Sequence, residues 1–291
     1  MLCAVLLASS CADSGPPAGR SVPRPVSPFP ASPSSPQAPP GHFVAVKGDW
    51  GSGLPAQRQV TDTMCRVRKA RTFEVVVTTG DNFYNPDGKA TDGNYYGPEA
   101  CLTGHPGHLW KATWGNHDVA GDSTQTVLGS SRWYSWATGG ADFFMLDSNQ
   151  PGNPEQTAWL SVGLAKSAAP FKIAVFHHPP FTGGFHENNL EIRTNWVPLF
   201  EQFKVKMVLS GHNHAYEHLV VGGIDYVISG GGGANVYPCV RQEPGQIGCR
   251  SVHHFLLLEV TSSKLTVQAI DGSGTEIDSF VLEDTPGARA P

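Results

Sequence analysis

Several short segments of the chain place glycine or proline beside side chains that carry lone pairs. They are Gly48-Asp49, Gly80-Asp81 followed by Tyr84, Gly115-Asn116-His117-Asp118, His177-His178-Pro179 and Gly211-His212-Asn213-His214. Carboxylate, amide, phenol and imidazole groups are ligands suited to iron, zinc or manganese. Two of the segments begin with a carboxylate directly after the glycine, and a carboxylate is the group needed to bridge two cations. The segments therefore predict a metal site built from oxygen and nitrogen ligands.

The spacing of the histidines indicates which of them can share a site. His212 and His214 are two residues apart, so in an extended segment both side chains lie on the same face. His177 and His178 are adjacent and would point in opposite directions in such a segment. We therefore expect His177 to face the site and His178 to face away from it.

The elements that must position these groups are short buried strands. An apolar run rich in β-branched or aromatic residues precedes each segment, at residues 43–46, 73–77, 109–114, 173–176 and 207–209. The carboxyl ends of strands in an open α/β sheet meet at one crevice, so the ligands are expected to converge there.

Helices are predicted between these strands. Residues 57–70 and 153–164 carry apolar residues at helical spacing. The second helix begins with Asn153 as the expected cap and Pro154 in the first turn, and Gln156 is expected to reach back to the cap. Strand and helix therefore alternate up to about residue 210.

The pattern changes after that point. Strands are predicted at residues 224–229, 254–260, 265–270 and 277–282, separated by turns of glycine and serine without helices between them. We expect these strands to form a meander that completes a second sheet, and residues 42–285 to form one domain.

Composition limits the class of protein. Of the 291 residues, 40% are hydrophobic, which is enough for a full-sized core, and only 15% are charged. A net charge of -5 and a pI near 6.2 argue against an electrostatic nucleic-acid binder, so no nucleic-acid binding is expected. No apolar run approaches the length of a membrane-spanning helix.

The N-terminal residues have the character of an export segment. Residues 1–11 are apolar up to Ala8 and end at Cys11, which predicts a signal with a lipoprotein cleavage box and a lipid on Cys11. A cytosolic N-terminus is the alternative. Residues 12–41 are rich in proline and predict an extended linker, and residues 286–291 form a short tail. Export would place the protein outside the cell, in the periplasm or on the cell surface, with membrane attachment only through Cys11.

Apart from Cys3 and Cys11, the chain has four cysteines. This even number predicts two disulfides in an exported domain. The four are Cys65, Cys101, Cys239 and Cys249. Three connectivities are possible, and the pair Cys239–Cys249, which flanks a loop containing proline and glycine, is favoured. Four free buried thiols are the alternative if the protein is not exported.

The order of the motifs resembles the metallophosphoesterases of the calcineurin-like fold, specifically the purple acid phosphatases. The matching motifs are Gly48-Asp49-Trp50-Gly51, Gly80-Asp81 with Tyr84, Gly115 to Asp118, His177 to Pro179 and Gly211 to His214. The resemblance runs from about residue 42 to residue 283 and is strongest to the short, mammalian-type members. Trp50 stands where the wider superfamily has histidine, and the presence of Tyr84 favours the purple acid phosphatase branch. The resemblance implies an α/β fold, a four-layer α-β-β-α sandwich of two mixed sheets flanked by helices.

The resemblance also implies a dinuclear metal centre, Fe(III) plus a divalent ion that could be iron, zinc or manganese. The implied ligands of the ferric ion are Asp49, Asp81, Tyr84 and His214. The implied ligands of the divalent ion are Asp81, Asn116, His177 and His212. Asp81 would bridge the two ions.

Three further residues are implied around the reacting group. His117 would contact the phosphoryl group or the leaving oxygen, and Asp118 would orient His117. His186 matches a family loop histidine that meets substrate, although a surface histidine on a glycine-rich loop is the alternative. The implied activity is that of an acid phosphatase that hydrolyses small-molecule phosphate monoesters by attack of a metal-activated hydroxide.

Two other functions remain open from the sequence. A phosphodiesterase or nucleotide hydrolase would use the same chemistry. A surface adhesion or binding protein that has lost activity is the alternative from another class, and the presence of all seven ligand types argues against it.

Overall fold

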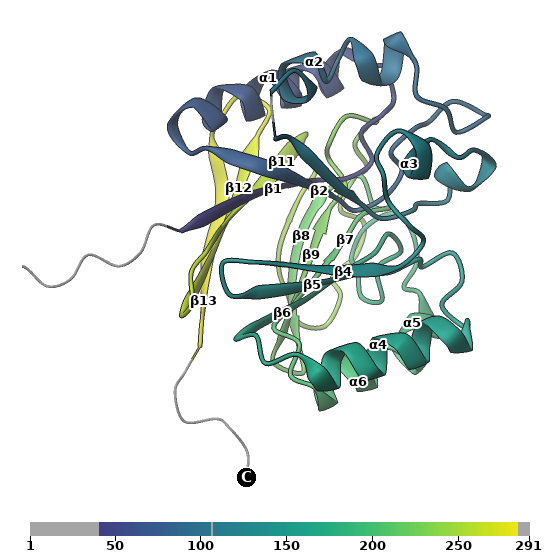
Figure 1. Cartoon of the computed structure of the whole chain (residues 1–291), viewed down its shortest axis with the longest axis vertical. Helices are drawn as coiled ribbons and strands as arrows, with labels where there is room; N and C mark the ends of the chain where they lie inside the picture. Colours follow the sequence, from purple (N-terminus) through teal and green to yellow (C-terminus); the bar gives the residue numbers. More distant parts are fainter. Residues whose placement is uncertain (1–40, 106, 285–291) are drawn as a thin grey trace, which may run out of the picture. The chain divides into compact units, whose positions relative to one another are not determined.

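The computed structural model describes residues 41–105 and 107–284, which form two β-sheets packed face to face with helices on their outer faces (Figure 1). The six-stranded sheet has the order β13-β12-β11-β1-β2-β3, and the seven-stranded sheet has the order β10-β8-β9-β7-β6-β5-β4. Each sheet contains both parallel and antiparallel pairs. The expected α/β fold, a four-layer sandwich of two mixed sheets, is therefore confirmed.

The strands of the first sheet are β1 (His42–Lys47), β2 (Phe73–Thr78), β3 (Leu109–Ala112), β11 (His254–Val260), β12 (Lys264–Asp271) and β13 (Glu276–Glu283). The strands of the second sheet are β4 (Tyr134–Thr138), β5 (Ala141–Met145), β6 (Phe171–Val175), β7 (Met207–Ser210), β8 (Tyr216–Val221), β9 (Ile224–Ser229) and β10 (Gln246–Arg250). The helices are α1 (Pro55–Ala70), α2 (Ala100–Thr103), α3 (Ser123–Thr126), α4 (Pro154–Lys166), α5 (Leu190–Asn195) and α6 (Val197–Gln202), with a π-turn at Asp92–Tyr96 and a 3-10 turn at Asp118–Ala120. The helices in the described part of the chain lack the length and apolar character that a membrane span requires.

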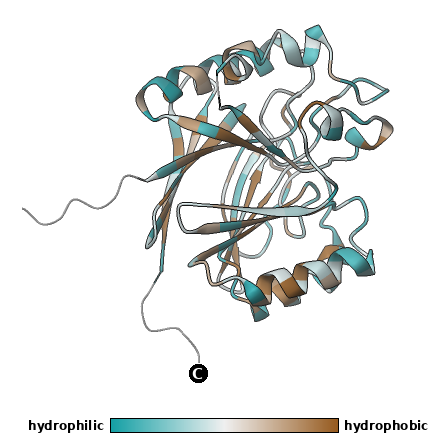
Figure 2. Ribbon diagram, viewed as in Figure 1, coloured by the Kyte–Doolittle hydropathy of each residue, from teal (hydrophilic) through white to brown (hydrophobic). Residues whose placement is uncertain are grey.

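Alternating side chains of the central strands fill separate apolar cores on the two faces of each sheet. Val44 and Val46 of β1 point into the core between the sheets, whereas Ala45 points toward α1 and packs with Val60 and Met64. The second sheet is covered in the same way by α4, α5 and α6 (Figure 1). Because both faces of the central strands are buried, their sequences are mostly apolar, and Figure 2 shows brown stretches along them.

The predicted helices are present, but one of their capping contacts differs from the prediction. The side chain of Asn153 accepts hydrogen bonds from the amides of Glu155 and Gln156, as expected for the cap of α4. The prediction that Gln156 reaches back to the cap is wrong. Its side chain is buried and instead bonds the backbone amide and carbonyl of Asp147, at 2.7 and 3.1 Å, because those groups need partners behind the end of β5.

The late strands are divided between the two sheets, which corrects the expected second-sheet meander. Strand β9 lies in the second sheet between β7 and β8, whereas β11, β12 and β13 extend the first sheet beyond β1. Strand β11 fits beside β1 because its leucines are buried on both faces, and it pairs antiparallel with Val44 opposite Leu258. Sheet membership here depends on pairing between residues about 200 positions apart, which no local pattern reports.

The described residues contain two disulfides, Cys65–Cys101 and Cys239–Cys249. The structure thus contains the pair that was favoured from the sequence, and the first bond joins α1 to α2. The predicted export signal with Cys11, the proline-rich linker up to residue 40 and the tail at 286–291 lie outside the described residues and stay predictions.

A buried ion pair connects the end of β1 to the helical layer. The Nζ atom of Lys47 lies 2.5 Å from Oε2 of Glu99, and neither side chain is exposed. Nζ also lies 4.3 Å from the centre of the Trp50 ring and donates to Thr61 of α1. Burial lowers the pKa of Lys47, and the Glu99 carboxylate opposes that shift. This pair fixes the residues that lead directly into Gly48-Asp49.

We expect Glu99→Ala to lower the free energy of unfolding by about 3–5 kcal/mol, because it leaves the Lys47 ammonium buried without its counter-ion. The matched control is Asp87→Ala, which removes an exposed partner 3.8 Å from Lys89 and should change stability by less than about 0.5 kcal/mol. Urea denaturation followed by tryptophan fluorescence measures both. Equal midpoints for the two variants would contradict the importance of the buried pair.

Candidate metal centre

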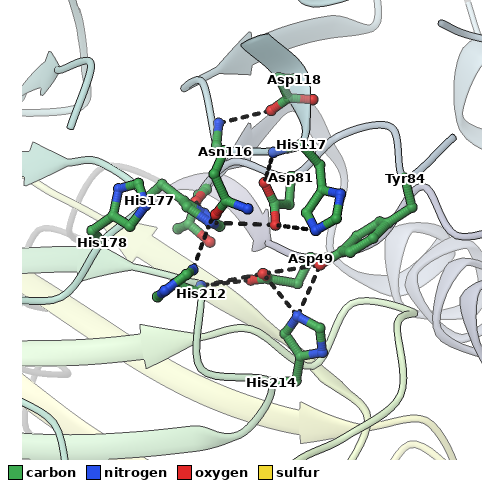
Figure 3. A network of polar contacts seen from close by, with 12 residues as sticks. Asp49, Asp81, Tyr84, Asn116, His117, Asp118, His177, His178, His212 and His214 are labelled. Carbon is green, nitrogen blue, oxygen red and sulfur yellow. Dashed lines mark hydrogen bonds and ion pairs between the residues drawn. The ribbon is translucent and has the colours of Figure 1, made fainter. Parts of the chain in front are cut away.

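The candidate ligands lie on the loops that follow strands of both sheets (Figure 3). The first sheet contributes the segments after β1, β2 and β3, and the second contributes those after β6 and β7. The convergence expected for strand carboxyl ends is therefore observed, and it takes place where the two sheets meet.

One group of side chains gathers around Asp49 (Figure 3). The phenol oxygen of Tyr84 lies 2.8 Å from Nε2 of His214 and 3.2 Å from Oδ1 of Asp49. His214 Nε2 is 3.3 Å from the same carboxylate oxygen. Asp81 offers an oxygen within 4.8 Å of the ligand atoms of Asp49 and His214. The four residues named for one ion thus point at a common position.

A second group gathers around His177. Its Nε2 atom lies 3.0 Å from Oδ1 of Asn116, 3.2 Å from Nδ1 of His212 and 3.4 Å from Oδ2 of Asp81. Asp81 therefore lies beside both groups, as expected for a carboxylate that would bridge two ions.

Backbone carbonyls orient two of the imidazoles. Nδ1 of His177 lies 2.9 Å from the carbonyl of Thr79, and Nδ1 of His214 lies 2.7 Å from the carbonyl of Asn235. A carbonyl only accepts, so each Nδ1 carries a proton and each Nε2 faces the site, where the neutral form of the ring would offer its lone pair to a metal ion. A metal ion bound at Nε2 requires this tautomer.

The electrostatics of the site are those of a cation site. Asp49 and Asp81 are fully buried, and among the described residues neither forms an ion pair with lysine or arginine. Burial favours protonation of Asp81, yet the neighbouring His177 keeps its pKa well below the ordinary value. Burial lowers the pKa of His177, but the Asp81 carboxylate outweighs it and raises that pKa to about 9. Within the described part of the chain, the only groups near these buried carboxylates that can carry positive charge are imidazoles. Bound metal ions would supply the additional positive charge that the carboxylates need.

Three of the candidate ligands have strained backbone conformations. Asp49, Asp81 and His212 have φ values of 56°, 50° and 68°, and the only other described non-glycine residue with positive φ is Lys204. The left-handed region costs an ordinary residue about 1–2 kcal/mol. The surrounding packing therefore imposes these conformations, which turn the side chains toward one another at the strand ends.

The glycines of the motifs are explained by close approach between the loops. A Cβ atom on Gly115 would lie 2.1 Å from Oδ1 of Asp81, and one on Gly48 would lie 1.8 Å from Oγ1 of Thr79. No side chain larger than hydrogen fits at either position without moving the neighbouring loop.

His178 was expected to face away, and this prediction is wrong. Its ring centre lies 4.6 Å from that of His212 and 4.8 Å from that of His177, so it belongs to the same cluster. The chain bends after β6, where the amides of His177 and His178 both donate to Oγ of Ser148, so the alternation of an extended strand does not apply. Burial and the neighbouring His177 lower the pKa of His178 to about 3, which keeps it neutral.

Asp118 does not bond the imidazole of His117, contrary to the expected role. Its buried carboxylate accepts hydrogen bonds from the amides of Gly115, Asn82 and Phe83, at 2.8, 2.9 and 3.2 Å. It therefore anchors the loop after β3 to the loop after β2. Burial and the nearby Asp81 charge raise the pKa of Asp118 to about 7.

The other two residues expected near the substrate lie at the open side of the site. The His117 side chain is 45% exposed, its amide donates to Oδ1 of Asp81, and its ring centre is 4.4 Å from that of Tyr84. His186 stacks on His212 with ring centres 4.0 Å apart and planes at 25°. Tyr237 was missed from the sequence, and its ring stacks on His214 at 4.1 Å.

Two mixed sheets that bring two linked groups of oxygen and nitrogen ligands to their strand ends have the arrangement of a dinuclear metallohydrolase. The family model of the calcineurin-like phosphoesterases matches residues 44–216, and the chain belongs to that family.

Individual relatives agree with this assignment. The chain is 28% identical over 282 residues to purple acid phosphatase 4 of Arabidopsis thaliana, with 81% of each chain covered, and 27% identical to purple acid phosphatase 7 of the same plant, with 79% of this chain and 82% of the relative covered. The resemblance to purple acid phosphatases is thus confirmed, and the predicted enzyme class, a phosphoester hydrolase, is that of these relatives.

Solved structures share the fold. A purple acid phosphatase from yellow lupin seeds superposes with a TM-score of 0.69 at 19% identity, covering 87% of this chain and 55% of the lupin chain. GAP50, the anchor in the inner membrane complex of Plasmodium, superposes with a TM-score of 0.72 at 18% identity, covering 84% of this chain and 89% of that chain.

We expect Gly115→Ala to reduce metal content and to lower phosphatase activity by about 100-fold, because the added methyl group displaces Asp81 from both ligand groups. Gly248→Ala is the control, since a Cβ there meets nothing within 4 Å. Metal analysis by mass spectrometry and a p-nitrophenyl phosphate assay check both variants. Full metal content in Gly115→Ala would contradict the close packing as the reason for this glycine.

Proposed function

We propose that this protein is a metal-dependent acid phosphatase that hydrolyses phosphate monoesters at a dinuclear centre of Fe(III) and a divalent iron, zinc or manganese ion. The observation that carries the proposal is the position of Asp81. Its carboxylate belongs to the group of Asp49 and His214 and also lies 3.4 Å from Nε2 of His177. One shared carboxylate between two ligand groups supports a pair of ions and not a single one.

The chain offers a ligand set for each ion. For the ferric ion the set is Asp49, Asp81, Tyr84 and His214. For the divalent ion it is Asp81, Asn116, His177 and His212. When bound, such a pair lowers the pKa of a shared water and neutralises charge on the phosphoryl group.

The position of Tyr84 suits the phenolate ligand that the Fe(III) assignment requires. Burial and the adjacent Asp49 carboxylate raise the pKa of the Tyr84 phenol well above its ordinary value. Only a strongly charged cation at this position would hold the side chain as a phenolate. The phenol is already directed at the carboxylate and imidazole that would share the ion, at 3.2 and 2.8 Å.

We assign to His117 the contact with the reacting phosphoryl group. Its amide is fixed to the bridging Asp81, and its ring is exposed at the open side of the centre. A histidine there can donate a hydrogen bond, or a proton, to the leaving oxygen. His186 stacks against His212, where it can meet another part of the substrate.

The similarity to GAP50 gives a second candidate, a binding protein without catalysis. The seven ligand residues of this chain, together with the carbonyl-oriented tautomers of His177 and His214, favour catalysis. Phosphate diesters are the substrate alternative, because the same centre would act on them.

We also propose that the protein is exported. Its two disulfides suit an oxidising compartment, outside the cell, in the periplasm or on the cell surface. A lipid on Cys11 would attach it to a membrane.

We expect Asn116→Ala and His212→Ala to abolish hydrolysis of p-nitrophenyl phosphate, because each removes a ligand of the divalent ion. Both variants should keep the circular dichroism spectrum of the wild type. His42→Ala, at the exposed start of β1, is the control and should stay active. Full activity in either ligand variant would refute the assigned site.

The purified protein is expected to absorb visible light through charge transfer between Tyr84 and iron. Tyr84→Phe should lose this band while retaining the fold. Metal analysis and an absorption spectrum of both proteins provide the test. A colourless, fully active wild type that contains only zinc or manganese would disprove the iron assignment and leave the hydrolase proposal standing.

A further inference from the structure

Three rings stand beside the candidate metal centre and belong to two separate loops. They are Phe185, His186 and Tyr237, which we call the aromatic wall. Tyr237 stacks on His214 with planes at 9°, and His186 stacks on His212. The three rings contact one another, because the ring centre of Phe185 lies 5.4 Å from that of His186 and 5.3 Å from that of Tyr237, and the last two are 5.5 Å apart. The wall therefore continues outward from two of the candidate ligands.

The two loops of the wall are bonded to each other. The guanidinium of Arg241 donates to the carbonyls of Gly184 and His186, at 2.8 and 2.7 Å. The amides of Val240 and Arg241 donate to the carbonyl of Gly183, at 3.1 and 3.0 Å. Two residues after Tyr237, the Cys239–Cys249 disulfide ties the same loop to β10.

The buried carboxylate of Glu217 holds the loop that carries Phe185 in place. Glu217, in β8, is fully buried and accepts hydrogen bonds from Oγ1 of Thr182 and the amide of Gly183, both at 2.7 Å. The side chain of Asn213 adds a bond to the amide of His186 at 2.7 Å. Phe185 is thus presented by a braced loop, so little ordering is needed when a ligand packs against its ring.

The ring of Phe185 remains 57% exposed despite this bracing. A single exposed phenylalanine is common on protein surfaces. This one differs because it is fixed against two other rings and lies next to histidines that face the reacting group. A leaving group that extends from the phosphoryl position past His186 would pass along it.

We propose that the aromatic wall binds the leaving group of the substrate, and that the preferred substrates are phosphate monoesters whose leaving group is a planar aromatic ring system. The ring would stack on Phe185 beside Tyr237. This inference rests on the proposed phosphatase function and adds the substrate class. Phe185 acts here as a specificity residue and takes no part in the metal centre.

The test compares 2-naphthyl phosphate with glycerol 2-phosphate on the metal-loaded, full-length enzyme. For each ester, kcat/KM of the wild type is divided by that of a variant, so that differences in leaving-group acidity cancel. For Phe185→Ala this ratio should be about 3- to 10-fold with naphthyl phosphate, mainly through KM, and near one with glycerol 2-phosphate. Phe185→Leu should show the same loss, and Phe185→Tyr should restore the wild-type value. Val281→Ala, exposed on the distant β13, is the matched control and should give ratios near one with both esters.

Equal losses with both esters, or full naphthyl activity in Phe185→Leu, would overturn the wall as a stacking site. Lack of activity of the wild type on both esters would count against the proposed phosphatase function alone. In that case, calorimetric binding of 2-naphthyl phosphate and of inorganic phosphate to the same variants decides the inference. A Phe185→Ala variant that binds both probes as the wild type does would disprove it.

Discussion

The geometry of the site depends on how closely the loops after β2 and β3 approach each other. Asp81 lies so near Gly115 that even a methyl group is excluded, and this contact places one carboxylate beside both ligand groups. Asp118 closes the same contact from behind by accepting amides from both loops. The arrangement of the two ligand groups therefore depends on the fixed position of this shared carboxylate.

The remaining ligands are held ready by parts of the chain that do not themselves coordinate. Carbonyls set the tautomers of His177 and His214, and left-handed backbone at Asp49 and His212 aims their side chains. Strain of this kind persists only when the surrounding packing overrides it. The buried Lys47–Glu99 pair and the two apolar cores provide that packing on the side of the first sheet. The packed layers thus stabilise the strained ligand conformations at the strand ends.

Local sequence patterns predicted most of the strands and the two longest helices, but they missed β4, β5, β8 and β10 and did not predict the long-range pairing. The strands at 224–229 and 254–260 have the predicted limits, because glycine and serine bound their apolar runs, yet they belong to different sheets. The motif order named the residues that the structure gathers around Asp49 and His177. It could not report that Ser148 turns His178 into the cluster, or that Tyr237 reaches His214 from a loop beyond β9. Such contacts arise only when distant segments fold together.

The origin of the ligands in two sheets has a consequence for cohesion of the domain. Asp49 and Asp81 follow strands of the first sheet, whereas His177 and His212 follow strands of the second. Ions held by both sets of ligands would link the two sheets, since separating the sheets would break coordination bonds as well as apolar contacts. By mass action, part of the free energy of metal binding then becomes free energy of folding. In such a protein the metal centre would both carry out the reaction and hold the two sheets together.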